Sequence, residues 1–419
     1  MTYQIVKGMK DIRDEDLLYW RQFEIKARKV MESFCFNEIR TPILELTELF
    51  QKGTGDTTDI VQKEMYTFTD KGGRSVTMRP EGTPPVVRSL LENSEDRIGG
   101  VYKYFYYGPM FRYEKPQKGR LRQFHQLGVE IFGLATAFSD AEVIDSIVKL
   151  CHELGIRDYR LFINSLGCDE CRPKFKEELI SYLTKTKDKL CKQCQERFET
   201  NPLRVFDCKN ETCQKLIKDA PSILDFLCNV CNDHFTCLKT TLENLKINFE
   251  VNHKIVRGLD YYSRTVFEFV SDALGSQNAF VGGGRYDRLI SDLGGKPMPA
   301  VGFGMGVERI IEIMKSKGIN PASGKKIFIS NTNLETKKKS FDLASILRAN
   351  GLSTYVNLQD KSLKAQFKTA DKNGFNLVLV IGEDELAESQ ITVKNLTNGE
   401  QQKVKQAGII TYIKEWQKT

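Results

Sequence analysis

Eight cysteines arranged as four close pairs restrict the fold of this 419-residue chain more than any other feature. The pairs are Cys168/Cys171, Cys191/Cys194, Cys208/Cys213 and Cys228/Cys231. The density of cysteine rises abruptly at Cys168, so we expect residues 164–240 to form an insertion between two halves of one larger domain. Those halves are residues 1–163 and residues 241–318.

Close cysteine pairs in a reducing compartment are typical of thiolate metal sites. Cys168-x2-Cys171 and Cys191-x2-Cys194 are separated by nineteen residues, a zinc-ribbon spacing that predicts one four-thiolate site. Cys208-x4-Cys213 and Cys228-x2-Cys231 would then make a second site. One or two structural Zn²⁺ ions are expected to stabilise the insertion, and the alternative is a set of buried, reduced cysteines without metal.

The apolar segments of the chain are too short to form a signal peptide or a membrane span, which indicates the compartment of the protein. Residues 1–16 are polar and lack the apolar stretch of a signal peptide. The longest aliphatic run, Leu377–Ile381, is far shorter than a membrane span. We therefore expect a cytoplasmic chain with reduced cysteines and no membrane partner. The formal net charge of +7 is a weak argument for nucleic acid, because clustering of charge matters more than its sum.

The first part of the chain carries helical and strand-like patterns. Apolar residues at spacings of three and four predict an amphipathic helix near the amino terminus. They are Trp20, Phe23, Ala27, Val30 and Phe34. Val101–Phe111 and Val129–Phe132 predict strands joined by the polar hairpin loop Arg112–Gln126, and Ser139–Leu154 predicts a helix. The fold class is therefore α+β, with a mostly antiparallel sheet flanked by helices.

The last part of the chain, residues 325–419, predicts a separate domain after the linker Gly318–Lys326. Strand-like segments alternate there with helices, which predicts a small α/β module. The strand-like segments are Lys326–Ser330, Thr354–Val356 and Leu377–Ile381.

Basic side chains are concentrated in the predicted hairpin loop. Arg112 opens the loop in Phe111-Arg112-Tyr113-Glu114, and Lys115, Lys118, Arg120 and Arg122 follow beside Gln117 and Gln123. A lone arginine here would indicate a solvated hairpin tip. Several guanidinium groups together suit a triphosphate or a phosphate backbone, because arginine offers planar bidentate donors to phosphate oxygens.

Glycine alternates with other residues in Val301-Gly302-Phe303-Gly304-Met305-Gly306-Val307-Glu308-Arg309, just before an apolar helix. Glycines at a strand-to-helix turn let a ligand approach the backbone, and tight packing of strand on helix is the alternative. The spacing is not that of the dinucleotide fingerprint. Arg309, one turn into the helix, favours an anionic ligand.

Taken together, these segments resemble known motifs. Arg40-Thr41-Pro42, Phe111-Arg112-Tyr113-Glu114 and Gly304-Met305-Gly306-Val307-Glu308-Arg309 resemble motifs 1, 2 and 3 of class II aminoacyl-tRNA synthetases. Arg79-Pro80-Glu81-Gly82-Thr83, Gln126-Leu127-Gly128-Val129-Glu130, Arg257-Gly258-Leu259-Asp260-Tyr261-Tyr262 and Val281-Gly282-Gly283-Gly284-Arg285-Tyr286-Asp287 resemble those of histidyl-tRNA synthetases. The resemblance covers nearly the whole chain. It implies a catalytic domain split by the insertion, a homodimer formed through motif 1, and an anticodon-binding domain in residues 325–419.

The resemblance also implies a role for individual residues. The α-ammonium of histidine would be held by the segment that contains Glu81, Gly82 and Thr83, together with Gln126. The imidazole would be read by Glu130 and Tyr262, with Tyr261 lining the same pocket. The α-phosphate of ATP would lie between the catalytic residues Arg112 and Arg257, and the outer phosphates beside Arg120 and Arg309. The acceptor end of the tRNA would contact Lys115, Gln117 and Arg122.

The implied reaction joins L-histidine to tRNA(His) with ATP and Mg²⁺, through a histidyl-adenylate, and releases AMP and diphosphate. Catalysis then needs mainly alignment and stabilisation of charge on the α-phosphate, because the transferred group is already activated. An imidazole has one donor and one acceptor nitrogen, so a carboxylate and a hydroxyl suit it. Considered alone, Glu130 would sooner indicate a strand carboxylate that faces solvent.

Two other functions compete with this one. A catalytically inactive, histidine-sensing paralogue that regulates histidine biosynthesis usually lacks the Arg257 motif and the carboxy-terminal module, and both are present here. Another class II enzyme, of the prolyl or threonyl type, is the second alternative. Threonyl enzymes carry a catalytic zinc with histidine ligands, whereas these cysteine pairs lie outside the motifs. The histidyl family often lacks such cysteines, so the chain departs from the family pattern in its insertion.

Overall fold

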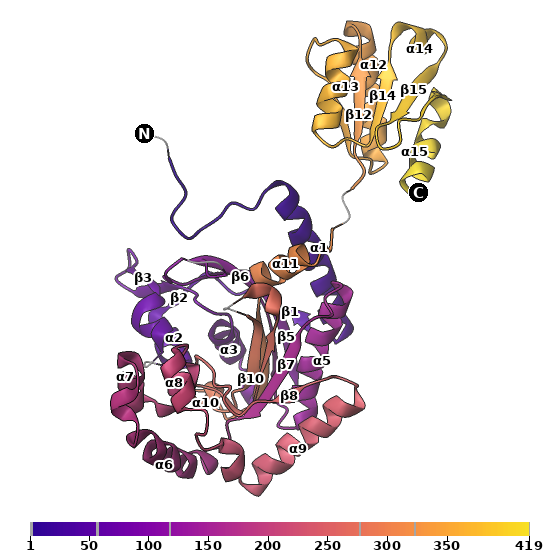
Figure 1. Ribbon diagram of the computed structural model, residues 1–419. Helices are drawn as coiled ribbons and strands as arrows, with labels where there is room; N and C mark the ends of the chain where they lie inside the picture. The colour runs from indigo at the N-terminus through magenta and orange to yellow at the C-terminus, as the bar shows by residue number, and fades with distance from the viewer. Residues whose placement is uncertain (1–2, 56–57, 117–118, 276–277, 322–323, 419) are drawn as a thin grey trace. The chain divides into compact units, whose positions relative to one another are not determined.

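The computed structural model describes residues 3–55, 58–116, 119–275, 278–321 and 324–418. The chain divides into two compact units, Met1–Pro321 and Ala322–Thr419 (Figure 1). The boundary between them lies within the linker Gly318–Lys326. Within the described ranges, none of the helices is both long enough and apolar enough to cross a membrane.

The first unit is built on one large sheet. Its strands are β1 (Asn37–Glu38), β5 (Tyr102–Phe111), β6 (Gln123–Phe132), β7 (Arg160–Ser165), β8 (Glu250–Val251), β9 (Ser263–Val270), β10 (Ala279–Arg285) and β11 (Ala300–Gly306). Their order across the sheet is β1-β5-β6-β11-β10-β9-β7-β8. The six central strands are mutually antiparallel, and only the two-residue edge strands β1 and β8 pair in parallel. The predicted α+β class with an antiparallel sheet is confirmed.

The hairpin of β5 and β6 is longer than the sequence indicated. Tyr102 pairs with Phe132 and Phe111 pairs with Gln123, so β6 begins at Gln123 and the connecting loop is shorter than the predicted Arg112–Gln126. The prediction was wrong because a strand ladder is made by backbone groups. Residues with polar side chains such as Gln123 and Gln126 can join the ladder without burying a polar group, because these side chains face an open cavity.

Helices cover the sheet and complete its core. They are α1 (Asp14–Ser33), α2 (Thr47–Thr54), α3 (Thr83–Glu92), α4 (Glu95–Ile98), α5 (Ala137–Glu153), α9 (Asn229–Asn244), α10 (Leu289–Asp292) and α11 (Val307–Ser316). Trp20, Phe23, Ala27 and Val30 of α1 are buried as predicted. Phe34 is only partly buried, because the helix ends at Ser33 and Cys35 takes a left-handed conformation with φ of 59°.

A buried ion pair connects the sheet to two of these helices. The guanidinium of Arg285 in β10 lies 2.6 Å from a carboxylate oxygen of Asp140 in α5, and both side chains are fully buried. The other oxygen of Asp140 lies 2.7 Å from Nε2 of His234 in α9. Buried charges need partners of this kind because desolvation otherwise destabilises the fold. The network therefore holds α5 and α9 in place beside the sheet.

The insertion contains three further helices between β7 and α9. They are α6 (Cys171–Thr184), α7 (Lys192–Thr200) and α8 (Glu211–Leu216), and they gather at one end of the unit (Figure 1). They enclose a small apolar core that includes Phe175, Val205 and Phe206 as well as three cysteines, with Cys191 partly buried against it. The insertion thus has a core of its own, which is much smaller than that of the main sheet.

A separate three-stranded sheet lies next to α2 and carries exposed apolar side chains. Its strands are β2 (Leu44–Leu46), β3 (Tyr66–Thr69) and β4 (Ser75–Met78), in the order β2-β4-β3. Leu44, Leu46 and Phe68 are each at least 46% exposed.

The second unit is an α/β module. Its elements are β12 (Ile327–Asn331), α12 (Leu334–Ala349), β13 (Thr354–Val356), α13 (Leu363–Lys372), β14 (Leu377–Ile381), α14 (Glu383–Ala387), β15 (Gln390–Asn395), β16 (Gln401–Lys405) and α15 (Ile409–Lys418). The sheet order is β13-β12-β14-β15-β16. The first three strands are parallel, as their alternation with helices predicts, and β15 and β16 add an antiparallel hairpin at one edge.

Candidate functional site

A cavity of about 1010 Å³ opens over the central strands of the first unit and gathers most of the predicted site residues. Those that line it are Glu81, Thr83, Arg112, Arg120, Gln126, Arg257, Tyr261, Tyr262 and Arg309. Gly82, Glu130, Lys115 and Arg122 do not line it, and Gln117 falls outside the described residues. A pocket that combines carboxylates, phenols and guanidinium groups suits a zwitterionic or polyanionic ligand.

A row of glycines, the glycine floor, crosses three strands at this cavity; Gly282 and Gly304 line it, and Gly128 lies against Tyr106. Gly128 of β6 pairs with Gly304 of β11, which in turn pairs with Gly282 of β10. A Cβ at Gly128 would lie 2.0 Å from the Tyr106 ring, and one at Gly282 would lie 1.9 Å from Nη2 of Arg257. The glycines therefore leave room for large polar side chains to lie flat against the sheet.

Glu130 lies near the carboxyl end of β6, does not line the cavity and is fully buried. The Thr83 hydroxyl donates to Oε1 at 2.7 Å, and the Tyr286 hydroxyl donates to Oε2. Gly302 of the neighbouring strand makes space for the carboxyl, because a Cβ there would lie 1.9 Å from Oε2. Burial raises the pKa of Glu130 to about 8. The alternative of a carboxylate that faces solvent is wrong.

Glu81 lies in the turn between β4 and α3 and is also buried. The Thr54 hydroxyl donates to one carboxylate oxygen at 2.6 Å, and the Tyr261 hydroxyl donates to the other at 3.0 Å. Burial raises the pKa of Glu81. Since Glu81 lines the cavity, it presents a poorly solvated carboxyl group to any ligand there.

The segment Arg257–Tyr262 forms one side of the cavity. Nη1 of Arg257 lies 2.7 Å from a carboxylate oxygen of Glu268 in β9, and its Nε is buried without a hydrogen-bond partner among the described residues. The rings of Tyr261 and Tyr262 are 4.7 Å apart, centroid to centroid. Six consecutive residues thus contribute two aromatic rings that line the cavity and one guanidinium group that is paired with Glu268.

The basic hairpin loop contributes further guanidinium groups. Arg112 is half-buried, with Nε donating to the Pro80 carbonyl at 2.9 Å and its guanidinium 5.2 Å from the Phe124 ring centroid. Arg120 pairs with Glu114 at 3.2 Å. The hairpin-tip alternative for Arg112 is therefore wrong.

Two other residues of the loop lie differently. The Arg122 guanidinium lies 3.8 Å from the Tyr113 ring centroid, outside the cavity, and Lys115 is exposed.

Arg309 lies in the first turn of α11, and its Nη2 donates to the Gly119 carbonyl at 3.2 Å. It therefore links the glycine-rich strand β11 to the basic loop. Gly304 and Gly306 line the cavity, whereas Gly302 accommodates Glu130. Gly304 and Gly306 therefore fit the interpretation that a ligand approaches the backbone. Gly302 fits the interpretation of close packing.

Sequence reasoning missed several side chains that orient the predicted ones. They are Thr54, Tyr106, Glu268 and Tyr286. Two had a signal: Tyr286 lies within the segment Val281–Asp287, and Glu268 interrupts the apolar run of β9. Thr54 and Tyr106 had none, because only the fold brings them to Glu81 and to the glycine floor.

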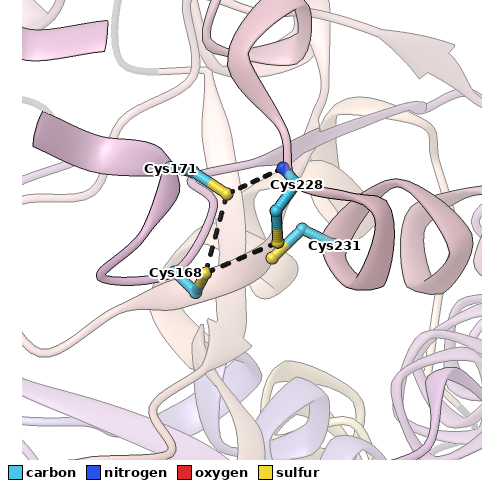
Figure 2. A group of neighbouring side chains, drawn as sticks. All are labelled: Cys168, Cys171, Cys228 and Cys231. Atoms are coloured by element: carbon cyan, nitrogen blue, oxygen red, sulfur yellow. Dashed lines mark hydrogen bonds between the residues drawn. The ribbon is translucent and has the colours of Figure 1, made fainter. Parts of the chain in front are cut away.

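The eight paired cysteines form two clusters in the insertion. Cluster A contains Cys168, Cys171, Cys228 and Cys231 (Figure 2), and cluster B contains Cys191, Cys194, Cys208 and Cys213. The predicted combination of the first pair with the second is therefore wrong. Cluster A joins the two ends of the insertion and cluster B lies within it, so the pairs are nested. Sequence spacing alone does not reveal how a chain folds back.

The thiol groups of each cluster lie within hydrogen-bond distance of one another and are not joined by disulfide bonds. Sγ of Cys168 lies 3.6 Å from that of Cys171 and 3.8 Å from that of Cys228, and Sγ of Cys191 lies 3.7 Å from that of Cys208. Backbone N–H groups donate to three of the sulfurs: that of Cys228 to Cys171, that of Cys191 to Cys213 and that of Asn210 to Cys208. A disulfide would require about 2.05 Å.

The burial of Glu130 predicts a pH dependence of stability. Its pKa is raised from an ordinary value of 4.5 to about 8 in the folded chain, so its contribution is fully present below about pH 4.5 and is lost as pH rises through about 8. Glu130→Gln removes this titration. The free energy of unfolding of the wild type should therefore fall relative to the variant across that window, by at most about 1.4 kcal/mol per pH unit.

Urea unfolding monitored by Trp20 fluorescence measures this difference, in a Trp416→Phe background that silences the second unit. Parallel stability curves for the wild type and Glu130→Gln between pH 4.5 and 8 would contradict the prediction.

Comparisons with known proteins identify the family of the chain. The family model described as "Histidyl-tRNA synthetase" matches residues 8–310, and that described as "Anticodon binding domain" matches residues 326–416. The chain is 46% identical to the histidine--tRNA ligase of Halothermothrix orenii over 98% of both chains. It is also 46% identical to that of Acetivibrio thermocellus, over 99% of this chain and 100% of the relative.

A solved structure gives the same result for the fold. The apo histidyl-tRNA synthetase of S. aureus superposes with a TM-score of 0.82 at 33% identity, covering 98% of this chain and 99% of that one. The motifs, the fold and the relatives coincide over nearly the full length, and the chain belongs to the histidyl-tRNA synthetase family, within the class II aminoacyl-tRNA synthetases.

Proposed function

We propose that this chain ligates L-histidine to tRNA(His) with ATP, through a histidyl-adenylate, and releases AMP and diphosphate. The observation that carries the proposal is the cavity itself, in which the buried carboxyl of Glu81 shares one space with the guanidinium groups of Arg112, Arg257 and Arg309. Such a site can bind the cationic ammonium of an amino acid and the anionic triphosphate of ATP next to each other. Relatives named histidine--tRNA ligase over nearly their full length support the same reaction.

Histidine would be held by its ammonium and by its ring. Glu81, Thr83 and Gln126 would bind the α-ammonium, since each lines the cavity and offers an oxygen acceptor. Gly82 belongs to this turn because a Cβ there would lie 2.1 Å from the Tyr106 ring.

The imidazole would be read by Glu130 and Tyr262, with Tyr261 beside them. In the free chain the Thr83 hydroxyl donates to Oε1 of Glu130 and lines the cavity, so it connects the hidden carboxyl to the ligand space. A ring N–H would take over that acceptor when histidine binds. An apolar competitor would offer neither a ring N–H nor an acceptor nitrogen to Glu130 and Tyr262, and sites that hydrogen-bond a polar substrate discriminate by roughly 10⁴–10⁵.

The phosphates of ATP would lie against the guanidinium groups. Arg112 and Arg257 would contact the α-phosphate from two sides, and Arg120 and Arg309 the outer phosphates. The buried Nε of Arg257, without a hydrogen-bond partner among the described residues, supports a ligand at that position. Mg²⁺ would neutralise the outer phosphates, and the carboxylates of Glu114 and Glu268, which line the cavity, suit a cation that prefers oxygen ligands.

The attack of the histidine carboxylate on the α-phosphorus needs alignment and charge stabilisation from this chain. Glu268 and Gly282 hold the Arg257 guanidinium against the sheet, and the Pro80 carbonyl holds that of Arg112. Donors fixed in advance stabilise the charge that develops in the transition state without rearranging.

The tRNA would be bound by both units. Lys115, Gln117 and Arg122 of the basic loop would contact the acceptor end, and residues 325–419 would form the anticodon-binding domain. The exposure of Lys115 supports the first assignment, and the match of residues 326–416 to an anticodon-binding family supports the second.

A homodimer in the cytoplasm completes the proposal. The exposed apolar side chains Ile43, Leu44, Leu46 and Phe68 lie next to Arg40-Thr41-Pro42 in the chain or in the sheet that follows it. An exposed apolar surface of this kind is typical of an interface. Eleven cysteines without a disulfide among the described residues are consistent with a reducing compartment.

The two cysteine clusters would each bind one structural Zn²⁺. Four thiolates around zinc at about 2.3 Å place the sulfurs about 3.8 Å apart. Three sulfur–sulfur distances of 3.6, 3.8 and 3.7 Å fit this tetrahedron, and all four sulfurs of each cluster lie within 4.8 Å of one another. Backbone N–H groups that donate to the sulfurs of Cys171 and Cys213 would further stabilise thiolates.

The experiment that tests the function is ATP–pyrophosphate exchange with single amino acids. Histidine should support exchange, and proline and threonine should not. Glu130→Ala should abolish histidine-dependent exchange, and Glu130→Gln, which keeps the shape of the side chain, should raise the KM for histidine more than that for ATP. A chain that binds histidine without any exchange would instead be the histidine-sensing paralogue, an alternative that the ligase relatives do not favour.

The glycine floor leads to a second prediction. Gly282→Ala would place a methyl group where the Arg257 guanidinium lies, so histidine-dependent exchange should slow by about 10²–10³. Gly408→Ala is the control, because a Cβ there meets nothing within 4 Å. Equal exchange rates for the two variants would remove Arg257 from the catalytic assignment.

Metal analysis tests the clusters. Purified chain should contain two equivalents of zinc, Cys194→Ser should lower this to about one, and Cys151→Ser should leave it at two because Cys151 lies in α5 outside both clusters. Protein isolated without zinc would exclude both sites.

A further inference from the structure

The insertion holds the segment Gly258–Tyr262 by three of its own side chains. Arg172 donates to the Tyr262 carbonyl and, through Nε, to the Leu166 carbonyl at 3.2 Å. Nη2 of Arg204 donates to the Gly258 carbonyl at 3.2 Å. Nδ2 of Asn201 donates to the Asp260 carboxylate at 3.3 Å. The contacts therefore reach the beginning, the middle and the end of this segment.

Each of these side chains is tied to a cysteine cluster. Arg172 directly follows Cys171 of cluster A (Figure 2), and Asn201 and Arg204 lie between Cys194 and Cys208 of cluster B. Arg204 is buried, in a turn whose Val205 and Phe206 pack with the cysteines of cluster B.

Cluster B also lies next to the cavity. Lys209, which follows Cys208, lines the same space as Arg257. Arg197 of α7 reaches Asp59, beyond the insertion, at 3.7 Å. The residues near cluster B therefore contact the catalytic domain close to the cavity.

The helices around cluster B are too short to be stable by themselves. Helices α7 and α8 have nine and six residues, below the roughly 12–15 residues at which isolated helices become even marginally stable. The apolar core of the insertion includes the cysteines themselves. Metal ligation in such small modules supplies much of the folding free energy. The positions of Asn201 and Arg204 therefore depend on cluster B.

We propose that the two clusters, with Zn²⁺ bound, position the Arg257–Tyr262 segment through Arg172, Asn201 and Arg204, so that zinc in the insertion controls histidine activation. This inference rests on the proposed function. Arg172, Asn201 and Arg204 are positioning residues, because they hold backbone and carboxylate groups of the segment and do not contact the ligand themselves. When a cluster loses zinc, the segment loses the partners that fix Arg257 and Tyr262, while the sheet below stays folded.

The test uses the full-length chain with Arg204→Met, Arg204→Lys and the control Lys176→Ala, an exposed residue of α6. Arg204→Met should retain full zinc yet show faster amide hydrogen exchange in residues 257–262. Its kcat/KM for histidine in pyrophosphate exchange without tRNA should fall about tenfold, the effect of one buried hydrogen bond. Arg204→Lys, which keeps a donor for the Gly258 carbonyl, should restore most of both properties.

Zinc removal from the wild type by a chelator should reproduce the faster exchange of residues 257–262 while strands β6, β10 and β11 stay protected. Wild-type protection of these residues in Arg204→Met, or in the zinc-free chain, would overturn the inference and leave the proposed function intact. A wild type without histidine-dependent pyrophosphate exchange would overturn the proposed function itself, whereas the hydrogen-exchange result would still report whether the clusters hold the segment.

Discussion

The structure depends on glycines that stand in register across three strands of the main sheet. Gly128, Gly304 and Gly282 pair side by side in β6, β11 and β10, and the missing side chains leave a shallow floor. Tyr106 and Arg257 occupy the space that a Cβ would take. A polar cavity thus opens over the sheet, whose apolar core packs with α1, α5 and α11.

That floor explains how charged groups are tolerated at the centre of the domain. Glu130 is fully buried, but Thr83 and Tyr286 donate to it and Gly302 gives it room. Arg257 is balanced by Glu268, and Glu81 by two hydroxyl donors. Burying such groups costs free energy unless partners are already oriented. The same orientation is what a transition state of changing charge requires, so stability and proposed catalysis depend on the same contacts.

The cysteine clusters extend this arrangement beyond the sheet. The Arg257–Tyr262 segment has the glycine floor below it and the insertion beside it, and the apolar core of the insertion is much smaller than that of the main sheet. A module of short helices linked by two four-cysteine sites is a compact way to make a rigid contact. In the proposed function, the insertion therefore acts on the segment that joins phosphate binding to imidazole recognition.

The sequence by itself determined the family and the α+β class, and it predicted nine residues that line the cavity, because the motifs combine chemically demanding residue types at set spacings. It also identified α1 and the α/β pattern of the second unit, since helix and strand periodicities are local. Only the tertiary structure decided that the cysteine pairs nest, that β6 starts at Gln123, and that Glu130 is buried behind Thr83. These features arise from contacts between residues far apart in the chain. Sequence spacing carries no information about which distant segments meet, so Thr54, Tyr106 and Arg204 gained their partners only through the fold.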